Sequence, residues 1–458
     1  MKPYRRFSPL TPVVRSFIFV AAAVVTTWRE LLRGDLGPFG WILLGLLVAG
    51  AVFGAASWLR TKYWIESDEL RVDTGVVSRQ SRRIRIDRLQ GIDIVQPFVA
   101  RLFGLAELRM DVAGGGAREG SLAFLTLSDA RALKDLLLAR RDAVRAAATN
   151  VVTSAEDASD VTSRPFERDR VLARVDLGML LASIALSFET VVLLLIMSGI
   201  AIGYAATFLG TGQWGGFSAT LPLLGGILLF QFRKLAGNYR FTVSQTPAGM
   251  QVRRGLFELS SQTIALPRLQ GIVISEPLLW RTMNWHRLDV SIAGYSSSSD
   301  SDGGPAASTV LPVGHRTLVR WLARYMLADM DAAPCELTAP PARARWVAPV
   351  GRHFMGVGLS ERVVVSREGV FTRRTHVVPH ARVQSLRVTQ GPWQRRLGLA
   401  DFHVDSPPGP VNVRAKHRYA AEARELLERE SVISRQVRRL VAGQDSGESS
   451  PDVAETIQ

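Results

Sequence analysis

Cysteine is nearly absent from this sequence of 458 residues, and several catalytic motifs are missing. The single cysteine, Cys335, cannot form a disulfide within the chain, and zinc sites built from cysteine pairs are excluded. Neither a phosphate-binding GxxxxGK[ST] element nor an HExxH element occurs. His376 and His380 are four residues apart in strand-like sequence, a spacing of roughly 13 Å that does not suit one metal ion. We therefore predict no catalytic residues, no metal and no cofactor.

Acidic residues are too few to balance the basic ones, and the formal net charge is +15. Such a charge points to an anionic partner, either nucleic acid or an acidic membrane face. Aromatic residues that alternate with basic ones, as in single-strand binding, are absent. The basic residues concentrate beside apolar segments, so we expect membrane lipids as partners and no nucleic acid.

Four apolar stretches predict transmembrane helices in two hairpins. Each pair is separated by a short connection, and no cleavage site follows the first stretch, which favours a retained anchor over a cleaved leader. The four stretches are residues 16–32, 39–59, 177–209 and 217–232.

Basic residues flank the outer ends of both hairpins, whereas the short connections within the hairpins carry little net charge. Basic residues remain on the cytoplasmic side of a membrane, so both termini and the segment between the hairpins should be cytoplasmic. We expect a multi-pass protein of the cell (inner) membrane.

One segment is present in three copies, the second and third lying 180 and 294 residues after the first. In each copy a glycine is followed thirteen residues later by an Arg-x-Gln element, which continues with glycine in two copies and with Ser385 in the third. The signature residues are Gly75, Arg88, Gln90 and Gly91; Gly255, Arg268, Gln270 and Gly271; and Gly369, Arg382 and Gln384.

Each copy reads as several short strands followed by one amphipathic helix. In the first copy Ile84 and Ile86 alternate with charged residues, as in a half-buried strand. The third copy has His380 at the position of Ile86, so its core must differ there. This pattern predicts a small barrel or sandwich closed by a C-terminal helix.

The hairpins, the repeated RLQGI at 88–92 and 268–272, and the glycine turns resemble the bacterial pleckstrin-homology-like (YdbS/YdbT-type) PH domain-containing membrane proteins. The resemblance implies a bent, seven-stranded antiparallel sandwich with a C-terminal helix for each copy, and no catalytic mechanism. The fold class expected is membrane α plus β, with four transmembrane helices and three cytoplasmic PH-like domains.

The expected boundaries follow from these patterns. They are a first hairpin at 1–60, a PH-like domain at 61–145, a linker at 146–175, a second hairpin at 176–236, a second domain at 237–330, a linker at 331–350, a third domain at 351–432 and a disordered tail at 433–458.

Two groups of polar residues are candidate sites. The basic run in the first copy would dock on anionic lipid headgroups, or would be an ordinary solvated strand face; its members are Arg79, Arg82, Arg83, Arg85 and Arg88. Glu189 lies within an apolar stretch, where ionisable groups are costly and often functional, although an interfacial position would also explain it.

The leading functional hypothesis is a membrane scaffold or adaptor that binds lipids and other membrane proteins, a paralogous PH-like protein among them. The alternative is a component of a transporter or exporter in which Glu189 acts within the membrane. A third alternative, an enzyme, would require titratable groups that converge in one pocket. The sequence does not define the oligomeric state.

Overall fold

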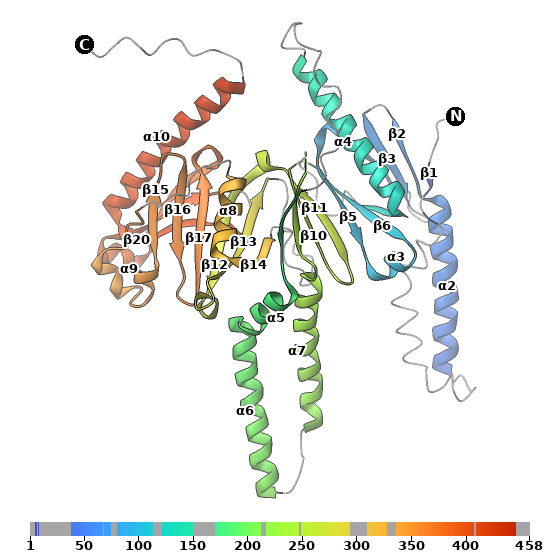
Figure 1. Ribbon diagram of the computed structural model, residues 1–458, viewed down its shortest axis with the longest axis horizontal. Helices are drawn as coiled ribbons and strands as arrows, with labels where there is room; N and C mark the ends of the chain where they lie inside the picture. Colours follow the sequence, from blue (N-terminus) through green and yellow to red (C-terminus); the bar gives the residue numbers. More distant parts are fainter. Residues whose placement is uncertain are drawn as a thin grey trace. The chain divides into compact units, whose positions relative to one another are not determined.

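The computed structural model of the chain contains antiparallel strands, helices that follow them and several long apolar helices (Figure 1). It describes residues 5–6, 8, 38–66, 68–74, 80–112, 121–150, 170–211, 217–246, 249–293, 309–327, 336–406 and 409–445. The chain divides into two compact units, the first containing residues 1–170 and 251–263 and the second residues 171–250 and 264–458. The expected span at 16–32 lies outside the described residues.

The first repeat consists of two three-stranded antiparallel sheets joined by a short 3₁₀ turn, η1 (Ile86–Arg88). Its core holds Leu70, Ile84, Ile86 and Leu108. The strands are β2 (Lys62–Glu66), β3 (Glu69–Thr74) and β4 (Gln80–Arg85), then β5 (Leu89–Gln96), β6 (Leu105–Val112) and β7 (Ser121–Thr126).

The other two repeats keep this order of strands and the 3₁₀ turn. The second repeat has β9 (Thr242–Thr246), β10 (Gly249–Arg254), β11 (Leu259–Ile264), η2 (Leu266–Arg268), β12 (Leu269–Pro277), β13 (Trp285–Ile292) and β14 (Thr309–His315). The third repeat has β15 (Gly356–Leu359), β16 (Val363–Glu368), β17 (Thr372–Pro379), η6 (His380–Arg382), β18 (Ser385–Thr389), β19 (Leu399–Asp405) and β20 (Val413–Tyr419).

The strands of the three repeats pair in one register. The fourth and fifth strands of each repeat align Ile94 with Leu108, Ile274 with Leu288 and Val388 with Phe402, which are equivalent positions in the three copies. Left-handed backbone also recurs at equivalent places, at Gly255 and Gly369 and at Gly104, Asn284 and Gly398. The φ angle is +113° at Gly255 and +100° at Gly369, values that residues other than glycine rarely adopt. The triplication in sequence is therefore a triplication in structure.

Each repeat has six strands of its own among the described residues, and the seventh place expected for a PH-like sandwich is filled by the preceding segment. In the first repeat β1 (Arg5–Arg6) places Arg5 opposite Tyr63. In the third, Thr338 pairs with Val357, which is the position equivalent to Tyr63. The segment β8 (Arg170–Arg174) precedes the second repeat, within the stretch expected to be a linker.

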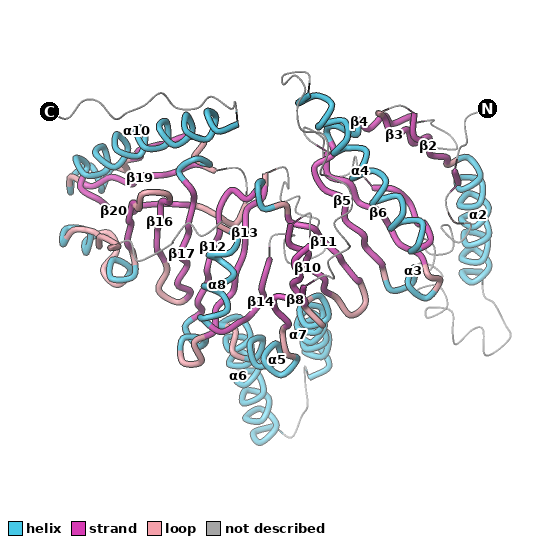
Figure 2. The backbone as a smooth tube through the Cα atoms, turned by 45° about the horizontal axis from the view of Figure 1, so that its top comes forward, coloured by secondary structure: helices cyan, strands magenta, loops and turns pink. Residues whose placement is uncertain are grey.

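A C-terminal helix closes each repeat: α4 (Leu127–Asn150), α8 (Arg316–Met326) and α10 (Ala420–Asp445). Figure 2 shows α4 lying across β5 and β6. The expected tail at 433–458 was wrong in its first part, because α10 continues to Asp445. Ser434 is buried, and Arg435 and Arg438 bond back to carbonyls one turn earlier, which favours continued helix.

The apolar stretches form α2 (Pro38–Arg60), α6 (Phe188–Thr211) and α7 (Phe217–Gly237). The expected stretch 177–209 is divided, because α5 (Leu177–Ala185) ends before Ser187 and α6 begins at Phe188. Among the described residues one helical segment, Phe188–Gly210, passes the test of length and apolar composition for a membrane span, rather than the four spans expected. The same test is met by core helices of soluble proteins, but the apolar window of this segment is not buried.

Successive repeats are joined by antiparallel strand pairing. Within the first unit the sheet order is β7-β6-β5-β11-β10, so a strand of the second repeat adds to the first repeat's sheet. Within the second unit the order is β14-β13-β12-β17-β16-β15, so the third repeat adds to the second in the same way. The two junctions use one register, because Leu259 opposite Gln96 and Arg373 opposite Glu276 occupy equivalent places.

A buried ion pair replaces apolar packing in the third repeat. His380 Nδ1 lies 2.8 Å from Glu430 Oε1, and His380 Nε2 lies 2.8 Å from the Ser360 carbonyl oxygen. Both His380 and Glu430 are fully buried. The Ser360 carbonyl can only accept, so Nε2 donates to it; with Glu430 ionised, Nδ1 also donates and the imidazole carries the positive charge. This pair fixes α10 to η6, and it is the core difference that the sequence predicts at position 380.

The His380–Glu430 pair makes stability depend on pH. Burial alone would lower the pKa of His380, but the hydrogen bond and charge of Glu430, with the Ser360 carbonyl, raise it above 6.5. The pair's contribution is therefore fully present below the unfolded pKa of about 6.5 and is lost as pH rises through the folded pKa.

Glu430→Gln should lower the free energy of unfolding by about 3 to 5 kcal/mol at pH 6, because it leaves a buried imidazolium without its counter-charge. Thermal unfolding of the detergent-solubilised protein from pH 5.5 to 9 measures this. The control, His380→Leu with Glu430→Leu, should unfold with a flatter pH dependence. A single variant that melts with the parent at pH 6 would contradict the role of the pair.

Candidate functional site

The repeated Arg-x-Gln element lies where the two sheets of each repeat are joined. Arg88, Arg268 and Arg382 are the last residues of η1, η2 and η6. The glutamine follows in the next strand in the first two repeats, at Gln90 and Gln270, and Gln384 lies directly before β18 in the third. A Cβ at Gly271 would lie 2.8 Å from the Val377 carbonyl oxygen of the adjoining repeat. The glycine therefore permits close approach of β17, which gives this part of the signature a structural role.

The third repeat has Ser385 at the position equivalent to Gly271. Ser385 is the first residue of β18, which is an edge strand of its three-stranded sheet in the described part of the chain. No neighbouring carbonyl has to approach there as Val377 approaches Gly271. The change from glycine to serine in the third copy follows from this difference.

The basic run of the first repeat is divided by the geometry of β4. Arg83 and Arg85 are exposed on one face, whereas Arg82 falls on the opposite face of the strand with Ile84. Arg88 lies beyond the strand in η1, and Arg79 lies outside the described residues. The structure thus brings Arg83 and Arg85 together and does not gather the run on one face.

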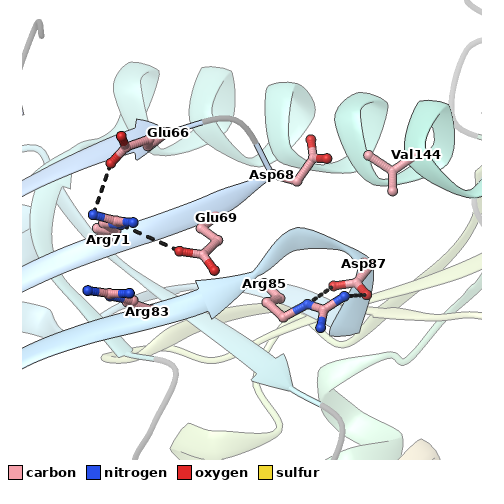
Figure 3. A pocket seen from close by; sticks show the side chains of 8 residues that line it. All are labelled: Glu66, Asp68, Glu69, Arg71, Arg83, Arg85, Asp87 and Val144. Atoms are coloured by element: carbon pink, nitrogen blue, oxygen red, sulfur yellow. Dashed lines mark hydrogen bonds and ion pairs between the residues drawn. The ribbon is translucent and has the colours of Figure 1, made fainter.

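Arg83 and Arg85 line a pocket of about 460 Å³ in which acidic side chains outnumber basic ones (Figure 3). The residues lining it are Glu66, Asp68, Glu69, Arg71, Arg83, Arg85, Asp87 and Val144. Arg71 pairs with Glu66 at 3.0 Å, and Arg85 pairs with Asp87 at 2.8 Å. Acidic groups within the pocket therefore already balance much of its positive charge, so an anionic headgroup would meet carboxylates as well as arginines.

The pocket lies away from α2. The strand β2 begins at Lys62, immediately after α2, and ends at Glu66 beside the pocket. Five residues of strand extend about 16 Å at roughly 3.3 Å per residue. In the first two repeats an apolar helix leads into the first strand. We call the end of the repeat where this strand begins the proximal end, and the opposite end the distal end. The pocket is distal, whereas Arg82, opposite Val72 and level with Tyr63, is closer to the proximal end.

Apolar side chains gather at the proximal end of the first repeat. The strand β5 runs toward this end and continues into α3 (Phe98–Leu102). Phe98, Leu102 and Phe103 are all exposed, and the Phe98 ring lies 5.5 Å from that of Phe257, also exposed. Contiguous exposed apolar groups of this kind are typical of surfaces that bind another protein, a ligand or a membrane.

The proximal end of the second repeat contacts the apolar helices directly. Its short helix η3 (Leu278–Arg281) is equivalent to α3, and Trp280 Nε1 donates to the Ser183 carbonyl of α5 at 3.1 Å. Trp280 is buried at this contact. The Phe371 ring, in the turn between β16 and β17, lies 5.2 Å from Phe188 at the start of α6. Helix α6 therefore leaves the protein from a surface built by the second and third repeats.

Glu189 lies in the first turn of α6, close to the domains. Its Oε2 accepts from Lys234 Nζ of α7 at 3.1 Å, and its side chain is 71% exposed. Next to this pair, Gln231 donates to Thr190, and Thr190 and Ser187 share a hydrogen bond. These polar contacts join the domain-side ends of α6 and α7, so Glu189 lies at the end of α6 nearer the strands.

Titratable groups elsewhere are held in local ion pairs. The His376 ring, whose Nε2 lies 3.8 Å from the carboxylate, and Lys416, at 2.7 Å, lower the pKa of Glu368 to about 2 against the opposing effect of burial. Among the described residues, no three His, Cys, Asp or Glu side chains are grouped to hold a metal ion. His376 therefore has a structural role within the third repeat.

Strand pairing between repeats and the proximal apolar surface are features that the sequence reasoning missed. In the sequence, a short apolar run such as Phe98–Leu102 suggests an ordinary buried segment. The structure shows that it follows β5 at the proximal end, where Phe98 and Leu102 are exposed. The glycine at 271 was a usable signal, since glycine inside a strand indicates close backbone approach.

Two comparisons with known proteins bear on this geometry. The model of the bacterial PH domain family matches residues 16–141 and 318–432, which together are just over half of the chain. The UPF0699 transmembrane protein YdbT of Bacillus subtilis (strain 168) is 23% identical over 293 residues, or 61% of this chain and 58% of that protein. The aligned region is thus little more than half of the relative's length.

Two substitutions separate the structural contact from the exposed ion pair. Trp280→Ala should lower the free energy of unfolding by about 3 kcal/mol or more, because it empties a buried site and removes the bond to α5. Glu189→Gln should change it by less than about 1 kcal/mol, since the pair with Lys234 is exposed. Thermal unfolding in one detergent compares them. Equal losses from the two substitutions would contradict this assignment.

Proposed function

This chain belongs to the bacterial PH domain family, and from that premise we propose that it is a multi-pass membrane protein serving as a non-enzymatic scaffold. One observation carries the proposal: α6 presents a 23-residue apolar segment, Phe188–Gly210, that the other described residues leave uncovered. Leu194, Leu195 and Ile202 are each more than half exposed on it. Exposure of such an apolar surface to water is unfavourable, whereas the hydrocarbon core of a bilayer accommodates it.

The remaining spans of the proposal are α2, α7 and the stretch 16–32. Helix α2 exposes Trp41, Leu46 and Val52 and has no charged residue before Arg60. Helix α7 is joined to α6 by a short connection, and both leave the strands in the same direction (Figure 1). Basic residues at the domain-side ends, such as Arg60 and Lys234, favour a cytoplasmic position for the repeats and both termini.

A scaffold role is supported by how the repeats are assembled. Strand pairing joins each repeat to the next in one register, and the proximal ends carry exposed apolar residues. Repeats joined in this way within each unit present several surfaces that other molecules can bind. The partners we propose are membrane lipids at the proximal ends and membrane proteins, including a paralogous PH-like protein, elsewhere. The relative's description as a transmembrane protein agrees with this placement.

Neither an enzyme nor a transporter has similar support. Arg71 and Arg85 of the first repeat's pocket are held by carboxylates of the same pocket, an arrangement typical of a stabilised turn. The transporter alternative requires Glu189 at membrane depth, whereas its place in the first turn of α6 beside Lys234 is an end position. We therefore propose a binding role for the chain.

Cysteine labelling tests the proposed topology. In a Cys335→Ser background, single cysteines are placed at Thr211, the last residue of α6, and at Ser385 in the third repeat. A membrane-impermeant maleimide should label position 211 in intact cells and position 385 only after lysis, because the two lie on opposite sides of the bilayer. Labelling of both positions in intact cells, or of neither, would overturn the arrangement.

A further inference from the structure

The third repeat lacks an apolar hairpin of its own, yet one of its ends reaches the start of α6. That contact is made by Phe371, whose ring lies 5.2 Å from Phe188 and whose side chain is 58% exposed. Both residues belong to the second unit, so the contact is internal to it. In the proposed arrangement, the turn between β16 and β17 therefore lies at the level where α6 enters the bilayer.

The order of strands places two further segments at this end. The strand β17 starts beside Phe371 and ends at η6, and β18 returns from η6 and leads into α9 (Pro392–Leu397). The strand β15 begins at Gly356, opposite Arg367 near the end of β16, so the preceding segment is also at this end. That segment contains η4 (Ala342–Trp346) and η5 (Gly351–Phe354).

Each of these segments exposes a tryptophan with an arginine over its ring. Trp393 of α9 is 70% exposed, and the Arg396 guanidinium lies 5.3 Å from its ring centroid. Trp346 of η4 is 72% exposed, and Arg345 lies 5.3 Å from its ring centroid. In the second repeat, by contrast, the tryptophan of the corresponding short helix is buried against α5.

We propose that this end of the third repeat rests on an anionic phospholipid surface, with Trp346 and Trp393 at the level of the headgroups. Tryptophan favours this level because its ring is apolar and its N–H still reaches water or headgroup oxygens. The arginines beside the two rings, with Arg395 on α9, are placed to bind lipid phosphates. The third repeat would thus be held to the bilayer by side chains instead of by spans of its own.

The inference rests on the proposed membrane function, and it extends that function to a repeat without a hairpin. It also differs from docking through the Arg83–Arg85 face, which is distal and balanced by carboxylates. A second protein is the other possible occupant of an exposed tryptophan surface. The continuity with the start of α6, and the basic residue beside each ring, favour lipid.

A polarity-sensitive fluorophore tests the contact in the full chain. In a Cys335→Ser background it is attached to one cysteine at a time, at Trp393, Trp346, Ser385 or Ile202. Ser385 is the matched control, because it is exposed on the same repeat at the η6 end of β18. Ile202 is exposed in the middle of α6 and reports the bilayer itself.

The chain is reconstituted into phosphatidylcholine vesicles with or without phosphatidylglycerol, and spin-labelled lipids quench the fluorophore. Quenching at 393 and 346 should exceed that at 385 several-fold and should increase with phosphatidylglycerol. Arg395→Gln with Arg396→Gln should remove the increase at 393.

The controls separate this inference from the function it rests on. Quenching at 202 without quenching at 393 and 346 overturns the lipid contact and leaves the proposed spans intact. No quenching at 202 overturns both. Protection of 393 that persists in lipid-free amphipathic polymer would show that protein covers the site, which also overturns the lipid contact.

Discussion

Main-chain hydrogen bonding between strands of successive repeats is the interaction on which the structure depends. The strands β5 and β12 each accept a strand from the following repeat, and the two junctions align equivalent residues. A strand inside a sheet has its backbone donors and acceptors satisfied on both sides, which an edge strand has not. Gly271 shows how the sequence accommodates this pairing, since any side chain there would meet the Val377 carbonyl. Within each unit, neighbouring repeats are therefore held together by main-chain hydrogen bonds between their strands.

The internal repeat could be predicted from sequence because each copy must meet the same backbone requirements. Glycine recurs where φ is strongly positive, as at Gly255 and Gly369, and apolar residues recur where strands face the core. The sequence predicts only that the core of the third repeat differs at His380. It does not indicate the pairing with Glu430, which lies 50 residues away in α10. Strand pairing between repeats was missed, since edge pairing depends on backbone groups that all residues share. The tail was misjudged because α10 continues past residue 433 with Ser434 buried, which the composition of the segment does not indicate.

Charge in this chain needs to be interpreted together with its geometry. The arginine run of β4 suggests a lipid-binding face in sequence, but strand alternation separates Arg82 from Arg83 and Arg85, and carboxylates balance part of the charge in the distal pocket. Whether any of these arginines binds lipid stays a prediction, as does a role for Glu189. The proximal ends offer apolar and basic groups together, in the arrangement that a bilayer surface favours.

Hydrogen–deuterium exchange of the reconstituted protein, followed by mass spectrometry, tests the joining of the repeats most directly. The strands β11 and β17 should exchange as slowly as β6 and β13, because each is flanked by hydrogen-bonded strands on both sides. Exchange of β11 and β17 at the faster rate of the edge strand β7 would contradict the account, since it would mean that the repeats are not paired.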